Sequence, residues 1–170
     1  MIDYARFHFL DASALVKLLL HPDIIEEGSE RLADYRRDNS NFGTINLCIT
    51  EALTVIKSKH FGSKKNRSLN LDGYLIVANR LKVMLGHKTI RAFEFDFLSN
   101  RNFTEACHLV KNHGIDLIDA FQLLSVSSGP FSSLTGKSHT LFITADENLS
   151  KAAQNEGIET WYCIRDAPSN

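Results

Sequence analysis

Short apolar runs alternate with longer stretches of helical periodicity along the chain, and this alternation restricts the fold more than any other feature. The run FHFL at 7–10 is typical of a buried strand. The stretch at 12–20 has the pattern of a helix, in which Lys17 interrupts an otherwise apolar run. A strand expected at 140–143 is likewise followed by a helix at 147–155. Alternating units of this kind predict an α/β fold, a three-layer α/β/α sandwich with a mostly parallel central sheet.

The remaining elements follow from the same patterns and from turn residues. Further helices are expected at 24–37, 47–61, 69–85, 103–112 and 117–126, further strands at 89–95 and 160–164, and loops at 38–43 and 127–138. In the helix at 24–37, the apolar face is expected to consist of Ile25, Leu32 and Tyr35. Without repeats or a Pro-rich linker, residues 1–170 are expected to form a single domain.

Composition excludes several classes of protein. A hydrophobic content of 44% and a charged content of 23% are typical of a globular chain and not of a disordered one. No apolar run has the length of a membrane span, and the start MIDYARFHF lacks the apolar core of a signal peptide, so we expect a cytoplasmic protein. Cys48, Cys107 and Cys163 lie far apart without C-x-x-C spacing, which favours buried thiols over a disulfide or zinc site.

Charge is distributed unevenly although the net charge is only −1. The helical segment at about 52–93 holds nine basic residues and one acidic residue, Asp72, whereas the rest holds ten basic and nineteen acidic residues. This segment is either a set of solvated helix faces or a basic arm that binds a polyanion. The candidates for contacts to nucleic-acid phosphates are Lys57, Lys59, Lys64, Lys65 and Arg67.

Acidic residues stand at positions where surface charge is an awkward explanation. Asp11 and Asp146 each follow an expected strand, Glu51 lies in an apolar helical stretch, and Asp119 precedes an apolar run. Asp11, Asp116 and Asp146 are equally suited to be helix N-caps, and Asp119 to be an acid of a first helical turn. Glu51 is harder to explain in this way, because apolar neighbours would surround an unpaired charge.

A common location would give these acids a chemical role. Ligands of α/β folds bind outside the carboxyl ends of the strands, where Asp11 and Asp146 are expected. If the two strands are parallel neighbours, these carboxylates come together, and helix starts could bring Glu51 and Asp119 to the same place. Grouped carboxylates repel one another, and a divalent cation with a preference for oxygen ligands, Mg²⁺ or Mn²⁺, would relieve the repulsion.

The chain resembles the PIN-domain nucleases from about Phe7 to Trp161. The resemblance rests on FLDASALVKLLL with Asp11, TEAL with Glu51, DLIDAFQLL with Asp119 and FITADENLSKAAQNEGIETW with Asp146. It implies that these acids form a site for Mg²⁺ or Mn²⁺. It also implies that hydroxyls at Ser13 and Thr144 support that site. Asp116 matches no such position clearly, so we expect an N-cap first and a supporting acid second.

This resemblance implies a metal-dependent endoribonuclease that hydrolyses RNA phosphodiester bonds. Many members of the family are VapC-type toxins of toxin–antitoxin pairs and homodimers, so a cognate antitoxin and a homodimer are expected partners. The alternative is a non-catalytic PIN-like module that binds RNA or protein. An aspartate phosphotransferase is disfavoured because Ser13 stands where a second aspartate is needed, and a dinucleotide-binding protein because no G-x-G-x-x-G follows the first strand.

Overall fold

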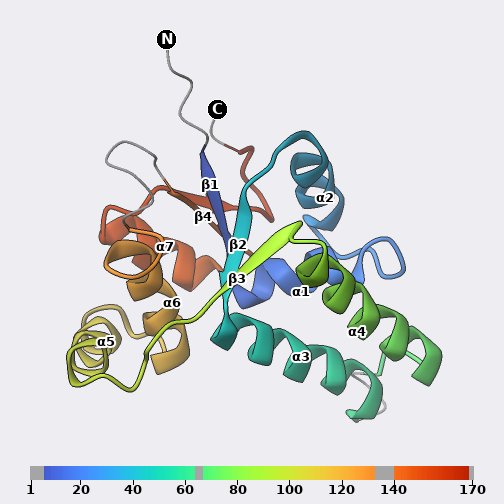
Figure 1. Cartoon of the computed structure of the whole chain (residues 1–170), viewed down its shortest axis with the longest axis horizontal. Helices are drawn as coiled ribbons and strands as arrows, with labels where there is room; N and C mark the ends of the chain where they lie inside the picture. The colour runs from blue at the N-terminus through green and yellow to red at the C-terminus, as the bar shows by residue number, and fades with distance from the viewer. Residues whose placement is uncertain (1–5, 64–66, 133–139, 169–170) are drawn as a thin grey trace.

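A parallel sheet with helices on both faces forms the centre of the protein (Figure 1). The computed structural model describes residues 6–63, 67–132 and 140–168. In these residues, five strands pair in the order β3-β2-β1-β4-β5, and every pairing is parallel. The strands are β1 (Phe7–Leu10), β2 (Phe42–Ile45), β3 (Ile90–Phe93), β4 (Thr140–Thr144) and β5 (Thr160–Tyr162).

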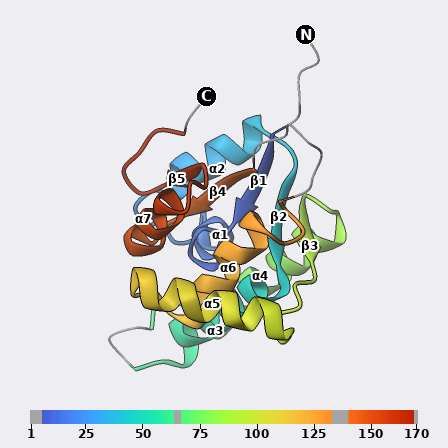
Figure 2. The ribbon, with the colours of Figure 1, turned by 90° about the vertical axis from the view of Figure 1, so that its left-hand side faces the viewer.

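The helices divide between the two faces of the sheet (Figures 1 and 2). One face is covered by α1 (Ala12–Leu20), α2 (Ser29–Asp38), α3 (Asn46–Phe61) and α4 (Leu71–Gly86). The other is covered by α5 (Asn100–His113), α6 (Leu117–Ser127) and α7 (Glu147–Asn155). This arrangement confirms the predicted three-layer α/β/α sandwich.

Alternation along the two central strands divides the core in two. Phe9 of β1 and Phe142 of β4 stack with ring centroids 5.4 Å apart and face α5, α6 and α7. Their neighbours Leu10, Leu141 and Ile143 point to the opposite face and pack with the buried residues of α1 to α4. Both faces of β1 are therefore buried, as the largely apolar run FHFL predicts.

Two expectations from the sequence are wrong. The loop expected at 38–43 overlaps β2, whose four residues FGTI are too short and too glycine-rich to stand out as a strand. Gly43 is needed there because a Cβ atom at this position would lie 2.7 Å from the ring of Phe7. The glycine that permits this close approach also removes an apolar side chain by which the strand could be predicted from the sequence.

The helix expected at 24–37 begins only at Ser29. Gly28 precedes it in the left-handed region, with φ 81°, and a Cβ atom at Gly28 would lie 2.6 Å from the carbonyl oxygen of Cys163. The Ser29 hydroxyl donates to the Glu26 carbonyl oxygen at 2.7 Å, which closes a turn where a helix was expected. Ile25 consequently lies outside α2 and is 66% exposed, whereas Leu32 is buried.

The other expected helices and strands are confirmed with shifts of a few residues at their ends, whereas residues 133–138 of the loop expected at 127–138 lie outside the described residues. Cys48 and Cys163 are buried and Cys107 is half-buried, and all three thiols are free. No helix in the described parts of the chain is long and apolar enough to cross a membrane.

The turn from α4 into β3 contains an unusual backbone conformation. Lys88 has φ 55°, in the left-handed region that glycine normally occupies after a helix. The Lys88 N–H donates to the Leu85 carbonyl oxygen at 3.1 Å, and the Thr89 N–H to that of Met84 at 3.0 Å. These two bonds close the helix end in the way that a glycine at this position usually permits, so a lysine here carries a conformational cost.

Replacing Lys88 with glycine is therefore expected to stabilise the protein. Lys88→Gly should raise the free energy of unfolding by about 0.5–1 kcal/mol, because it relieves the left-handed strain of a residue with a Cβ atom. Urea denaturation followed by circular dichroism measures the change. The control is Lys82→Gly in the interior of α4, which should lower stability by about 1 kcal/mol. Equal destabilisation by both substitutions would contradict the expectation.

Candidate acidic site at the carboxyl ends of the strands

Pairing of β1 with β4 brings the ends of these two strands together. Leu10 lies opposite Ile143, and the Asp11 N–H extends the pairing by donating to the Ile143 carbonyl oxygen at 3.1 Å. Asp11 and Thr144 therefore lie at the same edge of the sheet, and the two strands are parallel neighbours, the condition under which Asp11 and Asp146 were expected to come together. Asp11 is also the N-cap of α1, because its Oδ1 accepts the Ala14 N–H at 2.6 Å.

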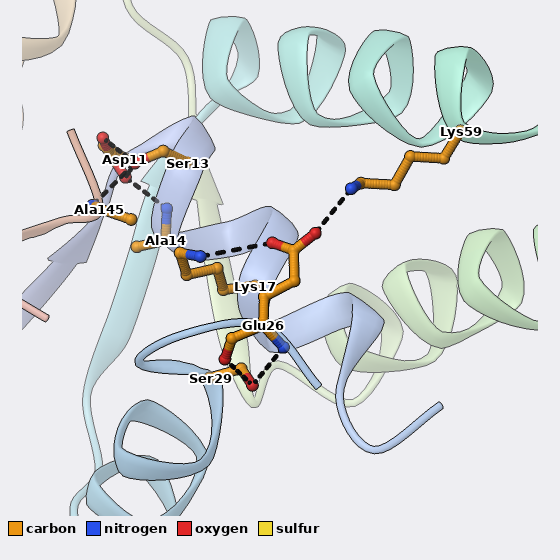
Figure 3. A network of polar contacts seen from close by, with 8 residues as sticks. All are labelled: Asp11, Ser13, Ala14, Lys17, Glu26, Ser29, Lys59 and Ala145. Atoms are coloured by element: carbon orange, nitrogen blue, oxygen red, sulfur yellow. Dashed lines mark hydrogen bonds and ion pairs between the residues drawn. The ribbon is translucent and has the colours of Figure 1, made fainter. Parts of the chain in front are cut away.

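Two hydroxyl groups, those of Thr144 and Ser13, hold the buried carboxylate of Asp11, and Figure 3 shows the contact with Ser13. The Thr144 hydroxyl donates to Oδ2 at 2.6 Å, and the Ser13 hydroxyl lies 2.8 and 2.9 Å from Oδ2 and Oδ1. The backbone N–H of Ala145 donates to the Ser13 oxygen at 2.8 Å, and that of Asp146 to the Thr144 oxygen at 2.9 Å. Because each hydroxyl oxygen accepts an N–H, its own proton remains for Asp11.

Burial nevertheless disfavours the charge of Asp11. It raises the pKa of this carboxyl group to about 7, although hydrogen bonds from Thr144, Ala14 and Ser13 oppose the shift, and the charge of Glu51 adds to it. The carboxylate accepts bonds on both oxygens, but the single Ser13 proton can serve only one of them at a time. Asp11 thus keeps lone-pair capacity for a further positive partner.

Glu51 projects from the middle of α3 and is half-buried. Its Oε2 accepts a hydrogen bond from Nε2 of Gln122, at 3.1 Å, across the contact between α3 and α6. Burial raises the pKa of Glu51, the charges of Asp116 and Asp146 raise it further, and the bond from Gln122 opposes the shift.

Sequence analysis missed Gln122, which is 1% exposed. Its Oε1 is buried and has no hydrogen-bond partner among the described residues, so its amide serves Glu51 alone. The signal was present in DAFQLL, where a polar side chain interrupts an apolar run three residues after Asp119 and hence on the same side of α6.

Asp116 and Asp119 begin α6. Asp116 is its N-cap and accepts the Asp119 N–H at 2.9 Å, as expected. Asp119 is half-buried, and burial raises the pKa of its carboxyl group to about 7; the charges of Asp116, Asp146, Glu51 and Asp11 raise it in decreasing order. All the predicted acids therefore lie near enough to Asp119 to act on its ionisation.

Asp146 is exposed and caps α7, with Oδ1 accepting the Leu149 N–H at 2.9 Å. Its other oxygen accepts no hydrogen bond within the described residues. The cap and a ligand role are compatible, because each uses a different oxygen atom.

A divalent cation fits the chemistry of this group of acids. Within residues 6–63, 67–132 and 140–168, no three Asp, Glu, His or Cys side chains stand close enough together to hold a metal ion as they are. Mg²⁺ does not need such a cage, since one or two carboxylates usually hold it while water and substrate phosphates complete the shell. The donors are oxygens only, which suits Mg²⁺ or Mn²⁺, and their mutual repulsion is the kind that a cation removes.

A cavity of about 250 Å³ adjoins the acids, and its lining includes Ser13 and Glu51. On its other side, Lys17 of α1 and Lys59 of α3 converge on Glu26, with Nζ to carboxylate distances of 3.3 and 2.6 Å (Figure 3). Partial burial alone would raise the pKa of Glu26, but the hydrogen bond and charge of Lys59, then those of Lys17, hold it below its ordinary value. The cavity is thus acidic at one end and carries two ammonium groups at the other.

The predicted phosphate-binding residues separate in the structure. Lys59 faces this cavity, whereas Lys57 is exposed on α3 and Arg67 is exposed after it. Lys64 and Lys65 lie outside the described residues. Of the three candidates within the described residues, Lys59 is the one that lines the cavity beside the acids.

Comparisons with known proteins give a fold and no family. No protein-family model matches the chain, and no curated protein matches it. Among solved structures, the chain is similar to the crystal structure of PAE2754 from Pyrobaculum aerophilum, with a TM-score of 0.57 and 19% sequence identity over 92% of this chain and 90% of that one. Similarity at this level of identity shows that the fold is shared.

The raised pKa of Asp119 predicts how stability depends on pH without metal. Its folded value of about 7 exceeds the ordinary 3.8, so the folded state holds a proton that the unfolded state releases between these values. Stability should therefore fall as pH rises through this window. Asp119→Asn should remove part of the fall and stabilise the metal-free protein at about pH 8 by about 1 kcal/mol, a value discounted for partial exposure.

The urea concentration at the midpoint of unfolding, determined in EDTA at the lower end of this pH window and at about pH 8, measures the effect. Asp166→Asn, which removes an exposed carboxylate that does not act on the ionisation of Asp119, is the control and should leave the pH dependence unchanged. A loss of stability with pH that is as steep in Asp119→Asn as in the wild type would show that the pKa of Asp119 is not raised in the folded protein.

Proposed function

We propose that this protein is a metal-dependent endoribonuclease of the PIN type that hydrolyses RNA phosphodiester bonds with Mg²⁺ or Mn²⁺. The observation that carries the proposal is the buried Asp11 carboxylate, held by two oriented hydroxyls at the carboxyl end of β1 and surrounded by acids that affect one another's ionisation. A structural N-cap needs one acceptor oxygen and no such neighbours.

The acids have separate roles in this proposal. Asp11 and Asp146 hold the ion most directly, and Asp119 completes the protein ligands. Glu51, kept in place by Gln122, orients the attacking water or holds a second ion. When bound, the metal supplies an activated water and neutralises charge on the phosphate and the leaving oxygen. Ser13 and Thr144 fix the orientation of Asp11 by neutral hydrogen bonds, so its negative charge remains available to a metal ion.

The choice of RNA rests on the sequence motifs around these acids, which resemble those of the PIN-domain nucleases. The adjoining cavity supports it, because Lys17 and Lys59 each donate only to Glu26 among the described residues and keep further N–H groups for a phosphate. A toxin role with a cognate antitoxin, a homodimer and a cytoplasmic location belong to the same proposal and rest on the same resemblance.

The first test is cleavage of a labelled single-stranded RNA by the purified protein with Mn²⁺, with Mg²⁺ and with EDTA. Asp11→Asn should lower the cleavage rate by more than about 100-fold, since residues that merely support metal ligands already contribute about 10–100-fold. Asp166→Asn, which removes an exposed carboxylate elsewhere, should cleave like the wild type.

If no cleavage is seen, calorimetric titration with Mn²⁺ distinguishes between the possible causes. If the wild type neither cleaves RNA nor binds Mn²⁺, the metal site does not exist, and the non-catalytic PIN-like module becomes the better explanation. If the wild type binds Mn²⁺ without cleaving the RNA, and Asp11→Asn abolishes this binding, the metal site is supported and the RNA tested is not the substrate.

Lys59 should act on RNA binding and not on the chemical step. Lys59→Gln is expected to raise KM about three- to tenfold with little change in kcat, and to lower by about 0.7 the slope of log affinity against log salt, as for one lost phosphate contact on a single strand. Lys57→Gln removes an equal charge from an exposed position of the same helix and is the control. Identical kinetics of the two variants would exclude a phosphate contact at Lys59.

A further inference from the structure

A second cavity, of about 640 Å³, lies at the opposite end of the sheet from the acids. The last turn of α2 lines it on one side, and the segments that enter β2 and β3 line it on the other. We call it the basic basin, because its charged lining residues are Arg36, Arg37, Lys88 and Arg91 and it has no acidic one.

The cations of the basic basin are largely without acidic partners. Arg37 pairs with Asp34 at 2.9 Å and Asp38 at 3.6 Å, and both of these acids lie outside the lining. Arg36, Lys88 and Arg91 form no ion pair with the part of the chain that the structure describes. Their charges therefore add up in one concave site.

Two of these guanidinium groups are placed in ways that surface solvation does not explain. Nε of Arg36 is buried and has no hydrogen-bond partner among the described residues. Such a donor is costly unless a ligand or water accepts from it. Arg91 lies over the Phe7 ring, 5.5 Å from its centroid, and donates to the Asn41 side-chain oxygen at 3.2 Å, so its planar group is held in place.

Two non-glycine residues of the basin have left-handed backbone conformations, which asparagine adopts more readily than lysine. Asn41 has φ 62° where the chain enters β2, and Lys88 has φ 55° before β3. A glycine at Lys88 would close the helix end with less strain, yet this position presents a lysine to the basin. Strain retained at a residue that lines a cavity points to a use for its side chain.

From this geometry we infer that the basic basin binds a phosphate-bearing ligand of nucleotide size. Guanidinium groups and an ammonium group are the donors that phosphate oxygens prefer, and the cavity volume lies in the range of small-molecule sites. The ligand is either a free nucleotide or successive phosphates of a single nucleic-acid strand, which share this chemistry. The site is independent of the acids at the other end of the sheet and does not rest on the proposed nuclease activity.

A competing explanation assigns Arg36, Arg37 and Lys88 to the helix ends, where cations complement the negative carbonyl groups. The two explanations differ at Lys88. A residue that serves the helix end matters for stability, whereas a residue that serves a ligand matters for binding, even in a variant that folds more stably.

Binding of a short fluorescein-labelled oligouridylate, followed by fluorescence anisotropy in EDTA, tests the inference. EDTA prevents metal-dependent cleavage and removes any metal ion that could bind the probe at the acids. Lys88→Gly and Arg91→Gln should each lower affinity about fivefold or more and reduce the salt slope by about 0.7, measured between about 50 and 200 mM salt. The controls are Lys82→Gly, in α4 outside the lining, and Lys111→Gln on α5, which should both bind like the wild type.

Competition separates the two sources of phosphate. Uridine monophosphate that displaces the probe from the wild type identifies a mononucleotide site, and failure to displace it identifies a site for a polynucleotide backbone. If neither uridine monophosphate nor the oligonucleotide binds at the lowest salt, the inference is overturned. It is also overturned if Lys88→Gly, folded and at least as stable as the wild type, binds the probe with unchanged affinity.

Discussion

The buried carboxylate of Asp11 is the constraint on which the rest of the site depends. It ends β1, caps α1 and receives the hydroxyl protons of Ser13 and Thr144, so one side chain joins two strands and a helix. Parallel pairing of β1 with β4 is a precondition, because only that register places Thr144 beside Asp11. An unpaired charge at this depth would be costly, and the hydrogen bonds offset the cost only in part, as the pKa of about 7 shows.

Prediction from sequence succeeded where local pattern and tertiary environment agree. The buried strands β1 and β4 have apolar runs, and each is followed by a helix with helical periodicity. The acids between strand and helix, Asp11 and Asp146, could be located for the same reason. It failed at β2, where close packing against Phe7 requires Gly43, and before α2, where Gly28 lies against a distant carbonyl group. Neither contact is visible in a sequence, because each joins segments far apart in the chain.

The candidate site shows the same division. Asp11 and Asp146 were singled out because each follows an expected strand. Asp119 was singled out because it precedes an apolar run, and Glu51 because a charge lies within an apolar helical stretch. Gln122 also interrupts an apolar run, but a neutral amide in a core helix has many uses, and only its contact with Glu51 gives it a role. The pairing of Lys17 and Lys59 through Glu26 joins three separate segments, so it too required the fold.

The two ends of the sheet differ in charge for a reason that parallel topology supplies. All strands point the same way, so the starts of α1 and α7 lie at one end of the sheet with Asp11 and Asp146 as their caps, and the end of α2 lies at the other with Arg36 and Arg37. Helix electrostatics alone would leave these charges exposed and separately solvated. Instead, Asp11 is buried among hydroxyls, and Arg36 has a buried donor without a partner beside a strained Lys88. At both ends the protein holds charges in costlier environments than helix capping requires, and the cation and the phosphate that we propose would each lower that cost.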